Sequence, residues 1–251
     1  MPFTAAPAAS TSRTESFTAG TQDSRELAQR KFSAAIFDLD GTLLNSMWVW
    51  QEVDLAFFAA RGIAMPDDYV QTIHGMTFRE TAEYTIARFG LHESPKEIMA
   101  EWNALSFAQY RDHVKLKPGA REFLHALKKQ NVKLATATAL TTQAMHAVLQ
   151  SNGVYDLFDA FTSADEVMRG KTFPDIYLLA AKKLSVPPAQ CIVFEDVRKT
   201  IAGIHAAGMK GCAVWDEHTH DWADMLREFD YNLVEFGESE MDYFVNCGDN
   251  S

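Results

Sequence analysis

The stretch AAIFDLDGT, residues 34–42, ends an apolar run with two acidic residues two positions apart. In an extended strand, residues i and i+2 point to the same side, so Asp38 and Asp40 share one face of the chain. Two carboxylates beside apolar residues repel each other and resist desolvation unless a cation or a shared proton compensates them. Gly41 permits the turn that follows, and Thr42 supplies a hydroxyl to it. The stretch indicates a buried strand with a metal-assisted site at its end; the alternative is an Asp-Gly turn with solvated acids.

The composition is that of a globular protein and disfavours several classes of partner. The 251 residues are 47% hydrophobic, which suits one α/β domain with an inserted subdomain. A formal net charge of −11 leaves no basic stripe for nucleic acid. The three cysteines lack metal-ligand spacing and favour a reducing, cytoplasmic compartment. The sequence leaves the oligomeric state open, and a monomer is compatible with it.

Residues 1–30 differ in composition from the rest of the chain. They are rich in Ala, Thr, Ser and Pro and contain no apolar run long enough for a signal peptide or a membrane span. A transit peptide is the alternative, but it would be richer in Arg and poorer in acids. We predict a disordered tail, no membrane association, and a fold that begins near Lys31.

The rest of the chain alternates between strand-like and helical segments. Four short β-rich runs are each followed by a segment of helical period: 33–38, 132–137, 191–195 and 211–215. This alternation predicts an α/β fold with a mainly parallel sheet and helices on both faces. The run 158–163 is a weaker strand candidate.

Between Ser46 and Lys117 we find no strand-like run, and the helix boundaries are clear. Capping boxes and helix-ending glycines mark them: Thr77 with Glu80, Ser94 with Pro95 and Glu97, Gly62, and Gly90. We therefore predict a helical cap over residues 46–117, inserted into a core made of residues 31–45 and 118–251. Both connections of such a cap flank the Asp38 site.

Two further motifs follow the cap. The strand-like run that ends at Thr138 places this hydroxyl and the amide of Ala139 at the carboxyl end of a strand, where ligands bind in open parallel sheets. The alternative for Thr138 is a β-branched residue that only fills space. Lys171 precedes the predicted helix 175–184 and is the candidate cation beside the acids, able to neutralise a transferring phosphoryl group.

A fourth motif repeats the first without a sequence relation to it. The apolar run 191–194 ends in Glu195 and Asp196. Two neighbouring strands that both end in carboxylates predict convergence on one hard cation with oxygen ligands, which is most often Mg²⁺.

These four motifs, in this order, resemble those of the haloacid dehalogenase-like superfamily over residues 32–215. The similarity is strongest to the β-phosphoglucomutase-like and phosphoglycolate phosphatase-like members, which carry a helical cap after the first strand. The resemblance implies a Rossmann-like core. It also implies that Asp38 is the nucleophile, Asp40 the general acid and base, Thr138 a phosphate-binding hydroxyl and Lys171 a charge-stabilising cation.

The same resemblance implies the metal ligands and the substrate contacts. Mg²⁺ is expected on the Asp38 carboxylate, the Asp40 main-chain carbonyl and Asp196, with Glu195 beside them. Phosphate is expected on Thr138, Ala139 and Lys171. The cap loop 74–79 is expected to set specificity, with Thr77 and Arg79 as substrate contacts; His74 is equally compatible with a structural role.

The resemblance implies a Mg²⁺-dependent phosphatase that hydrolyses a small phosphorylated metabolite through an aspartyl phosphate. One alternative is a phosphomutase, although Trp50 replaces the linker histidine of β-phosphoglucomutase. A second is a catalytically silent binding protein that retains the fold. Trp48 and Trp50 either face the substrate or pack the cap, and their apolar neighbours favour packing.

Overall fold

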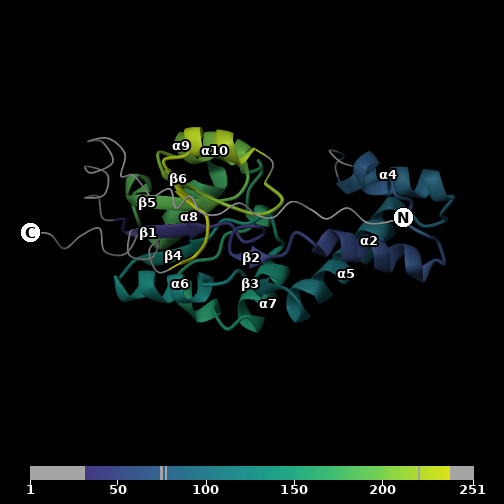
Figure 1. Cartoon of the computed structure of the whole chain (residues 1–251), viewed down its shortest axis with the longest axis horizontal. Helices are drawn as coiled ribbons and strands as arrows, with labels where there is room; N and C mark the ends of the chain where they lie inside the picture. The colour runs from purple at the N-terminus through teal and green to yellow at the C-terminus, as the bar shows by residue number, and fades with distance from the viewer. Residues whose placement is uncertain (1–31, 74–75, 77, 220, 238–251) are drawn as a thin grey trace, which may run out of the picture.

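The computed structural model describes residues 32–73, 76, 78–219 and 221–237. The predicted tail, together with His74, Thr77 and Cys247, lies outside these residues. Figure 1 shows a sheet with its helices on one side of the molecule and the helices α2, α4 and α5 on the other. Within the described part of the chain, no helix has both the length and the apolar character needed to cross a membrane.

The core contains a five-stranded sheet in the order β4-β1-β5-β6-β7, with every neighbouring pair parallel. The strands are β1 (Ala34–Phe37), β4 (Lys133–Thr136), β5 (Cys191–Glu195), β6 (Lys210–Val214) and β7 (Tyr231–Leu233). The strand that leads into the DLDGT motif, β1, is therefore an interior strand, between β4 and β5. This confirms the predicted α/β fold with a mainly parallel sheet.

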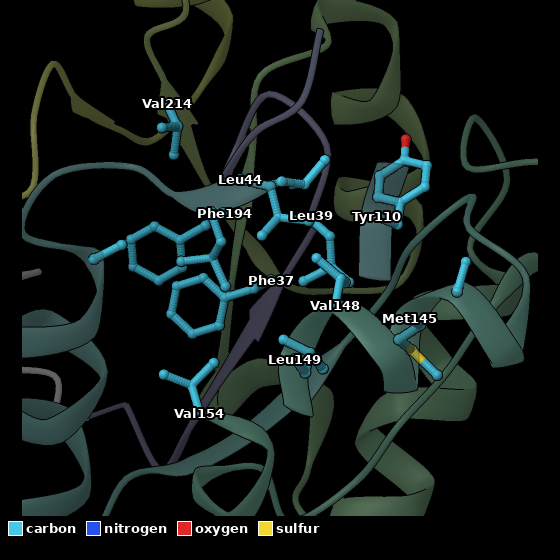
Figure 2. Packing of buried hydrophobic residues seen from close by; sticks show 14 of the residues in the cluster. Phe37, Leu39, Leu44, Tyr110, Met145, Val148, Leu149, Val154, Phe194 and Val214 are labelled. Atoms are coloured by element: carbon cyan, nitrogen blue, oxygen red, sulfur yellow. The ribbon is translucent and has the colours of Figure 1, made fainter. Parts of the chain in front are cut away.

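The side chains of β1 alternate between two buried layers, as the period of a strand requires. Phe37 belongs to the layer under α6 (Ala120–Lys129) and α7 (Thr142–Ser151), where it stacks on Phe194 with ring centroids 4.6 Å apart. Figure 2 shows these two rings beside Leu149 and Val154. Ile36 belongs to the opposite layer, under α8 (Asp175–Leu184), α9 (Ile201–Ala206) and α10 (Trp222–Glu228). With both faces covered, β1 is fully buried and must be apolar throughout.

Short 3₁₀ turns connect these elements: η1 (Tyr155–Leu157), η2 (Ala164–Glu166), η3 (Pro188–Gln190) and η4 (Arg198–Thr200). The run 158–163 forms no strand. It makes only isolated parallel bridges from Ala160 to Ala135 and from Ser163 to Thr138. The expectation of a strand here was wrong, because this segment pairs with the β4 region only at single, separated residues and forms no continuous hydrogen-bonded ladder.

The helices between residues 46 and 117 are α2 (Val49–Ala60), α3 (Tyr69–Ile73), α4 (Phe78–Phe89) and α5 (Pro95–Asp112). The predicted capping box starts α5, since Ser94 accepts from the Glu97 amide and Glu97 accepts from the Ser94 amide. Gly62 and Gly90 follow α2 and α4 with positive φ, as expected of helix-ending glycines. We propose that these four helices form the cap.

Two short strands join this helical layer to the core. β2 (Leu44–Asn45) pairs antiparallel with β3 (Lys115–Leu116), so the two chain connections lie side by side. The expectation of no strand between Ser46 and Lys117 was therefore wrong at β3, because two residues are too few to give an alternating pattern. β7 was also not expected, since only three residues pair there.

Candidate active site

The site lies at the carboxyl ends of β1 and β5. Asp38 directly follows β1, where its amide donates to the Phe194 carbonyl at 3.0 Å, and its side chain is 7% exposed. Lys171 enters from the loop before α8, with Nζ 2.5 Å from Asp38 Oδ1 and 2.6 Å from Glu195 Oε1. The structure thus brings together three of the residues that the sequence singled out.

Asp38, Glu195 and Asp196 form a compact group of acids. One carboxylate oxygen from each lies within 4.8 Å of the others, and all three residues are buried. Thr42 holds Asp196 in place, since its hydroxyl donates to Asp196 Oδ1 at 2.8 Å. The two strands and the DLDGT turn therefore converge at one point.

This group has the chemistry of a site for a hard divalent cation. Burial raises the pKa of Asp196, and the neighbouring Asp38 and Glu195 raise it further, so ionising all three acids together is unfavourable. Burial also raises the pKa of Glu195, against the opposing effect of Lys171. Lys171 supplies one positive charge, which leaves the ionised group with an excess of negative charge. Three oxygen ligands with uncompensated charge suit Mg²⁺.

Gly41 adds steric evidence that this arrangement is specific. Its φ is +69°, and a Cβ at this position would lie 2.2 Å from Asp196 Oδ2. Only glycine allows the turn to approach the carboxylate so closely. The DLDGT turn and Asp196 are therefore packed as one unit.

Asp40 lies apart from that group and has its own partners. Its Oδ1 accepts a hydrogen bond of 2.6 Å from Ser46 and one of 2.8 Å from Tyr110. Burial raises the pKa of Asp40 to about 6, and the charge of Asp38 acts in the same direction. A carboxyl group with this pKa exchanges protons readily near neutral pH, as a general acid and base must.

Thr138 and Ala139 follow β4 at the same edge of the sheet. Thr138 is buried, and its Oγ1 accepts from the Leu140 amide at 3.1 Å. Ala139 lines a cavity of about 550 Å³ between the cap helices and α7. Tyr110, which donates to Asp40, also lines this cavity, whereas Asp38, Lys171, Glu195 and Asp196 are not among its lining residues.

The described residues of the predicted cap that were candidates for substrate contact do not lie beside the acids. Arg79 is 75% exposed and pairs with Glu83 at 2.9 Å along α4, with no described contact to the core acids. Trp50 packs edge-on against Phe78 and also lines the cavity. Trp48 donates through Nε1 to the Asn45 carbonyl at 2.9 Å. Trp50 thus packs against α4 and also lines the cavity, while Trp48 is hydrogen-bonded to the connection at Asn45.

Sequence reasoning missed Ser46 and Tyr110. The signal for Tyr110 was present, because Ile98, Trp102, Ser106 and Tyr110 are buried at intervals of four along α5. Two of these four positions are polar, at the end of the helix nearest the core. Ser106 donates to the Asn103 carbonyl within α5, whereas Tyr110 donates to Asp40.

Comparison with known proteins agrees with this geometry. The family model described as haloacid dehalogenase-like hydrolase matches residues 35–214. Validoxylamine A 7′-phosphate phosphatase from Streptomyces hygroscopicus subsp. limoneus is 34% identical over 208 residues, which cover 82% of this chain and 95% of that protein. Hexitol phosphatase B from Escherichia coli K12 is 29% identical and covers 74% and 84%, respectively.

The fold is also found in a solved structure. β-Phosphoglucomutase from Clostridium difficile aligns with a TM-score of 0.63 at 23% identity, covering 86% of this chain and 97% of that one. On the family match and the relatives together, this chain is an enzyme that belongs to the haloacid dehalogenase-like hydrolase family.

Proposed function

We propose that the protein is a Mg²⁺-dependent phosphatase that hydrolyses a small phosphorylated metabolite, of the sugar or polyol phosphate class, through an aspartyl phosphate on Asp38. The observation that carries this proposal is the grouping of Asp38 with Lys171, Glu195 and Asp196, while Asp40 stands apart on Ser46 and Tyr110. One carboxylate is thereby available as a nucleophile and another as a proton carrier. The named activities of the two sequence relatives support the same reaction class.

In the first step, a carboxylate oxygen of Asp38 forms a bond to phosphorus as the bond from phosphorus to the leaving oxygen breaks. Asp40 gives its proton to the leaving oxygen. In the second step, water attacks the phosphorus, Asp40 takes a proton from it, and the bond to Asp38 breaks to release phosphate. Lys171 balances negative charge on the phosphoryl oxygens.

Asp38, Glu195 and Asp196, with the main-chain carbonyl of Asp40, would hold the Mg²⁺. When bound, the ion supplies further positive charge for the phosphoryl oxygens. Thr138, Ala139 and Lys171 would bind the phosphate. We also propose a cytoplasmic location, on the cysteine usage of the sequence.

The lining of the cavity favours hydrolysis over phosphomutase activity. Among the described residues that line it, Asp165 is the only charged one. The others supply aromatic faces and neutral hydrogen-bonding groups, such as Phe107, Asn103 and Gln143. A mutase must bind a second phosphate while its intermediate reorients, and a cavity without a cation binds a second anion poorly.

The proposal is tested with the wild-type enzyme and Asp38→Asn, assayed on an aryl phosphate and on a panel of hexose and hexitol phosphates. We expect activity only with Mg²⁺, and a loss of at least about a hundredfold in Asp38→Asn with an unchanged circular dichroism spectrum. Asp40→Asn should accumulate a phosphoenzyme detectable by intact mass. Activity in Asp38→Asn near the wild-type level would rule out the covalent mechanism.

The same assays separate the alternatives. Conversion of a hexose 1-phosphate in the presence of catalytic bisphosphate, faster than release of phosphate, would indicate a mutase. No turnover of any phosphate ester, together with retained Mg²⁺ binding, would indicate a silent binding protein.

A further inference from the structure

Lys117 joins three segments that are far apart in the sequence. It follows β3, at the second connection between cap and core. Its ammonium donates to the carbonyl of Gly41 in the DLDGT turn, and to the carbonyl of Trp215 after β6 at 2.9 Å. It also pairs with Asp216 Oδ2 at 2.8 Å. The Lys117 amide donates to the Leu43 carbonyl at 2.8 Å, so both ends of this residue hold the same turn.

We propose that Lys117 is a positioning residue that fixes the turn carrying Asp38 and Asp40 while the cap moves about the β2–β3 pair. This inference rests on the proposed function, because it assigns Lys117 a part in keeping the nucleophile and the acid in place. It adds a residue that makes no contact with Asp38, Glu195 or Asp196 among the contacts described for it.

The ion pair of Lys117 with Asp216 is largely shielded from water, while the contact with the Trp215 carbonyl is exposed. The Lys117 side chain is 15% exposed and that of Asp216 is 8% exposed. Asp216 is held in turn, since its Oδ1 accepts from the His218 amide and contacts His218 Nδ1, both at 2.9 Å. Charged hydrogen bonds in a shielded site are stronger than neutral ones. Lys117 thus connects the turn to a buried carboxylate that is itself hydrogen-bonded.

Position, rather than charge, is what this residue contributes. The charge of Lys117 is balanced by Asp216, so the pair adds little net field at the acids. The carbonyl that Lys117 binds belongs to Gly41, the residue directly after Asp40. Gly41 also lies against Asp196. A shift of this peptide would therefore displace two candidate Mg²⁺ ligands together, the main-chain carbonyl of Asp40 and the carboxylate of Asp196.

The β2–β3 pair explains why the DLDGT turn needs to be held in place. Closing a cap over a substrate rotates the connections between the two layers. Lys117 lies immediately beyond β3, on the core side of this hinge. Its contacts with Gly41, Leu43 and Trp215 stop the rotation from reaching the reacting groups, where a misplacement of about 1 Å can cost about a hundredfold in rate.

The test compares Lys117→Met with Lys133→Met. Lys133 makes the same kind of contact, an ammonium donating to the Leu184 carbonyl at 2.8 Å, at the first residue of β4 and away from the site. We expect both variants to lose some stability. Only Lys117→Met should lose kcat, by about 10- to 100-fold on aryl and sugar phosphates alike, with KM within about twofold of wild type. Lys117→Arg should recover part of the loss.

Hydrogen exchange gives a readout that does not depend on phosphatase activity. The amides of Thr42 and Leu44 both donate to the Leu39 carbonyl within the turn. They should exchange faster in Lys117→Met but not in Lys133→Met. An inactive wild-type enzyme would refute the proposed function, while this exchange difference would still test the role of Lys117.

Two results would overturn the inference: kcat of Lys117→Met within about twofold of wild type under conditions where the variant is folded, or unchanged exchange at Thr42 and Leu44. If Lys117→Met does not fold, Asp216→Ala replaces it, because this change removes the side-chain oxygens that anchor Lys117 and leaves Lys117 in place. Unchanged kcat and unchanged exchange in Asp216→Ala would equally contradict the proposal.

Discussion

Tyr110, in the last turn of α5, donates a 2.8 Å hydrogen bond to the same oxygen of Asp40 that accepts from Ser46. One donor comes from the helical layer and the other from the connection next to β2. The orientation of Asp40 therefore depends on where α5 lies relative to the sheet. Figure 2 shows Tyr110 at the edge of the apolar cluster that contains Phe37, Leu39 and Leu44. Packing thus fixes the helix that delivers this hydroxyl.

We expect Tyr110→Phe to lower kcat about 5- to 10-fold, because one hydrogen bond that orients Asp40 is worth roughly 1 kcal/mol. Steady-state kinetics with an aryl phosphate measure this. Tyr69→Phe is the matched control, since Tyr69 makes a buried 2.8 Å hydrogen bond with Thr85 inside the cap. It should cost a similar amount of stability and leave kcat unchanged. A wild-type kcat in Tyr110→Phe would show that Ser46 alone orients the acid.

A second prediction concerns Gly41. It separates the cost of a side chain at positive φ from the displacement of Asp196. Gly41→Ala should weaken Mg²⁺ binding by at least about tenfold, because its Cβ would displace Asp196. Gly90→Ala carries a comparable φ of +64° with nothing within 4 Å of its Cβ. It should cost about 1 kcal/mol of stability and leave Mg²⁺ affinity unchanged. Calorimetric titration with Mg²⁺ alone measures the difference. Equal Mg²⁺ affinities for the two variants would exclude Asp196 as a ligand.

A third prediction concerns Asp54, a buried acid of α2 away from the site. Burial raises its pKa to about 6 from an ordinary 3.8. The folded state then binds a proton more tightly than the unfolded state, so this contribution to stability is complete below about pH 4 and is lost as the pH rises to about 6. Tyr69, whose pKa burial raises to about 12, stays neutral over this range.

Asp54→Asn should therefore stabilise the protein above pH 6 by about 1 to 2 kcal/mol relative to wild type, after allowance for solvent screening. Urea unfolding of both proteins at pH 4.5 and at pH 7.5 measures the difference. A stability difference independent of pH would show that Asp54 ionises in the fold as it does in water.

The strands and helices of the core could be predicted because their local sequence patterns are typical of one kind of buried element. The run 34–37 is apolar at every position, which is typical of a short strand buried on both faces, and the acids that follow it then lie at the carboxyl end of that strand. Helix α8 was predicted with its observed bounds, 175–184, since Pro174 and the apolar period mark it. The grouping of Asp38, Glu195 and Asp196 follows from the parallel order of β1 and β5.

Other features depend on contacts that no local pattern encodes. The β2–β3 pair is held by two residues from each strand, and the paired residues are 72 and 70 positions apart in the chain. The ion pair of Lys117 with Asp216 joins the end of the predicted cap to the residue after the predicted strand 211–215, and no local pattern pairs the two. Tertiary packing brings these groups together, so they become visible only once the strands are ordered.

A fourth prediction tests the cavity as the leaving-group site. Trp50 is 46% exposed and lines the cavity together with Ala139 and Leu140 of the core. Trp50→Ala should lower kcat/KM for a hexitol or hexose phosphate about tenfold more than for a small aryl phosphate, because the sugar loses an apolar surface to pack on. Trp48→Ala is the control, because Trp48 lies two residues away and is not among the residues that line the cavity. Equal losses on both substrates in Trp50→Ala would mean that Trp50 only packs the cap.

The last prediction decides how Arg79 acts. In the structure Arg79 pairs with Glu83 one turn along α4, and its guanidinium is largely exposed. If cap closure carries it to the substrate, Arg79→Ala should lower kcat/KM for an anionic sugar phosphate far more than for an aryl phosphate, while Glu83→Ala should not, since it frees the guanidinium without removing it. We expect this pattern. An exposed pair of this kind stabilises a helix by only about 0.3–0.5 kcal/mol, so neither change should unfold the cap. Equal losses in the two variants would instead place Arg79 in a bracing role through Glu83, and the specificity of the enzyme would then rest on the cavity walls.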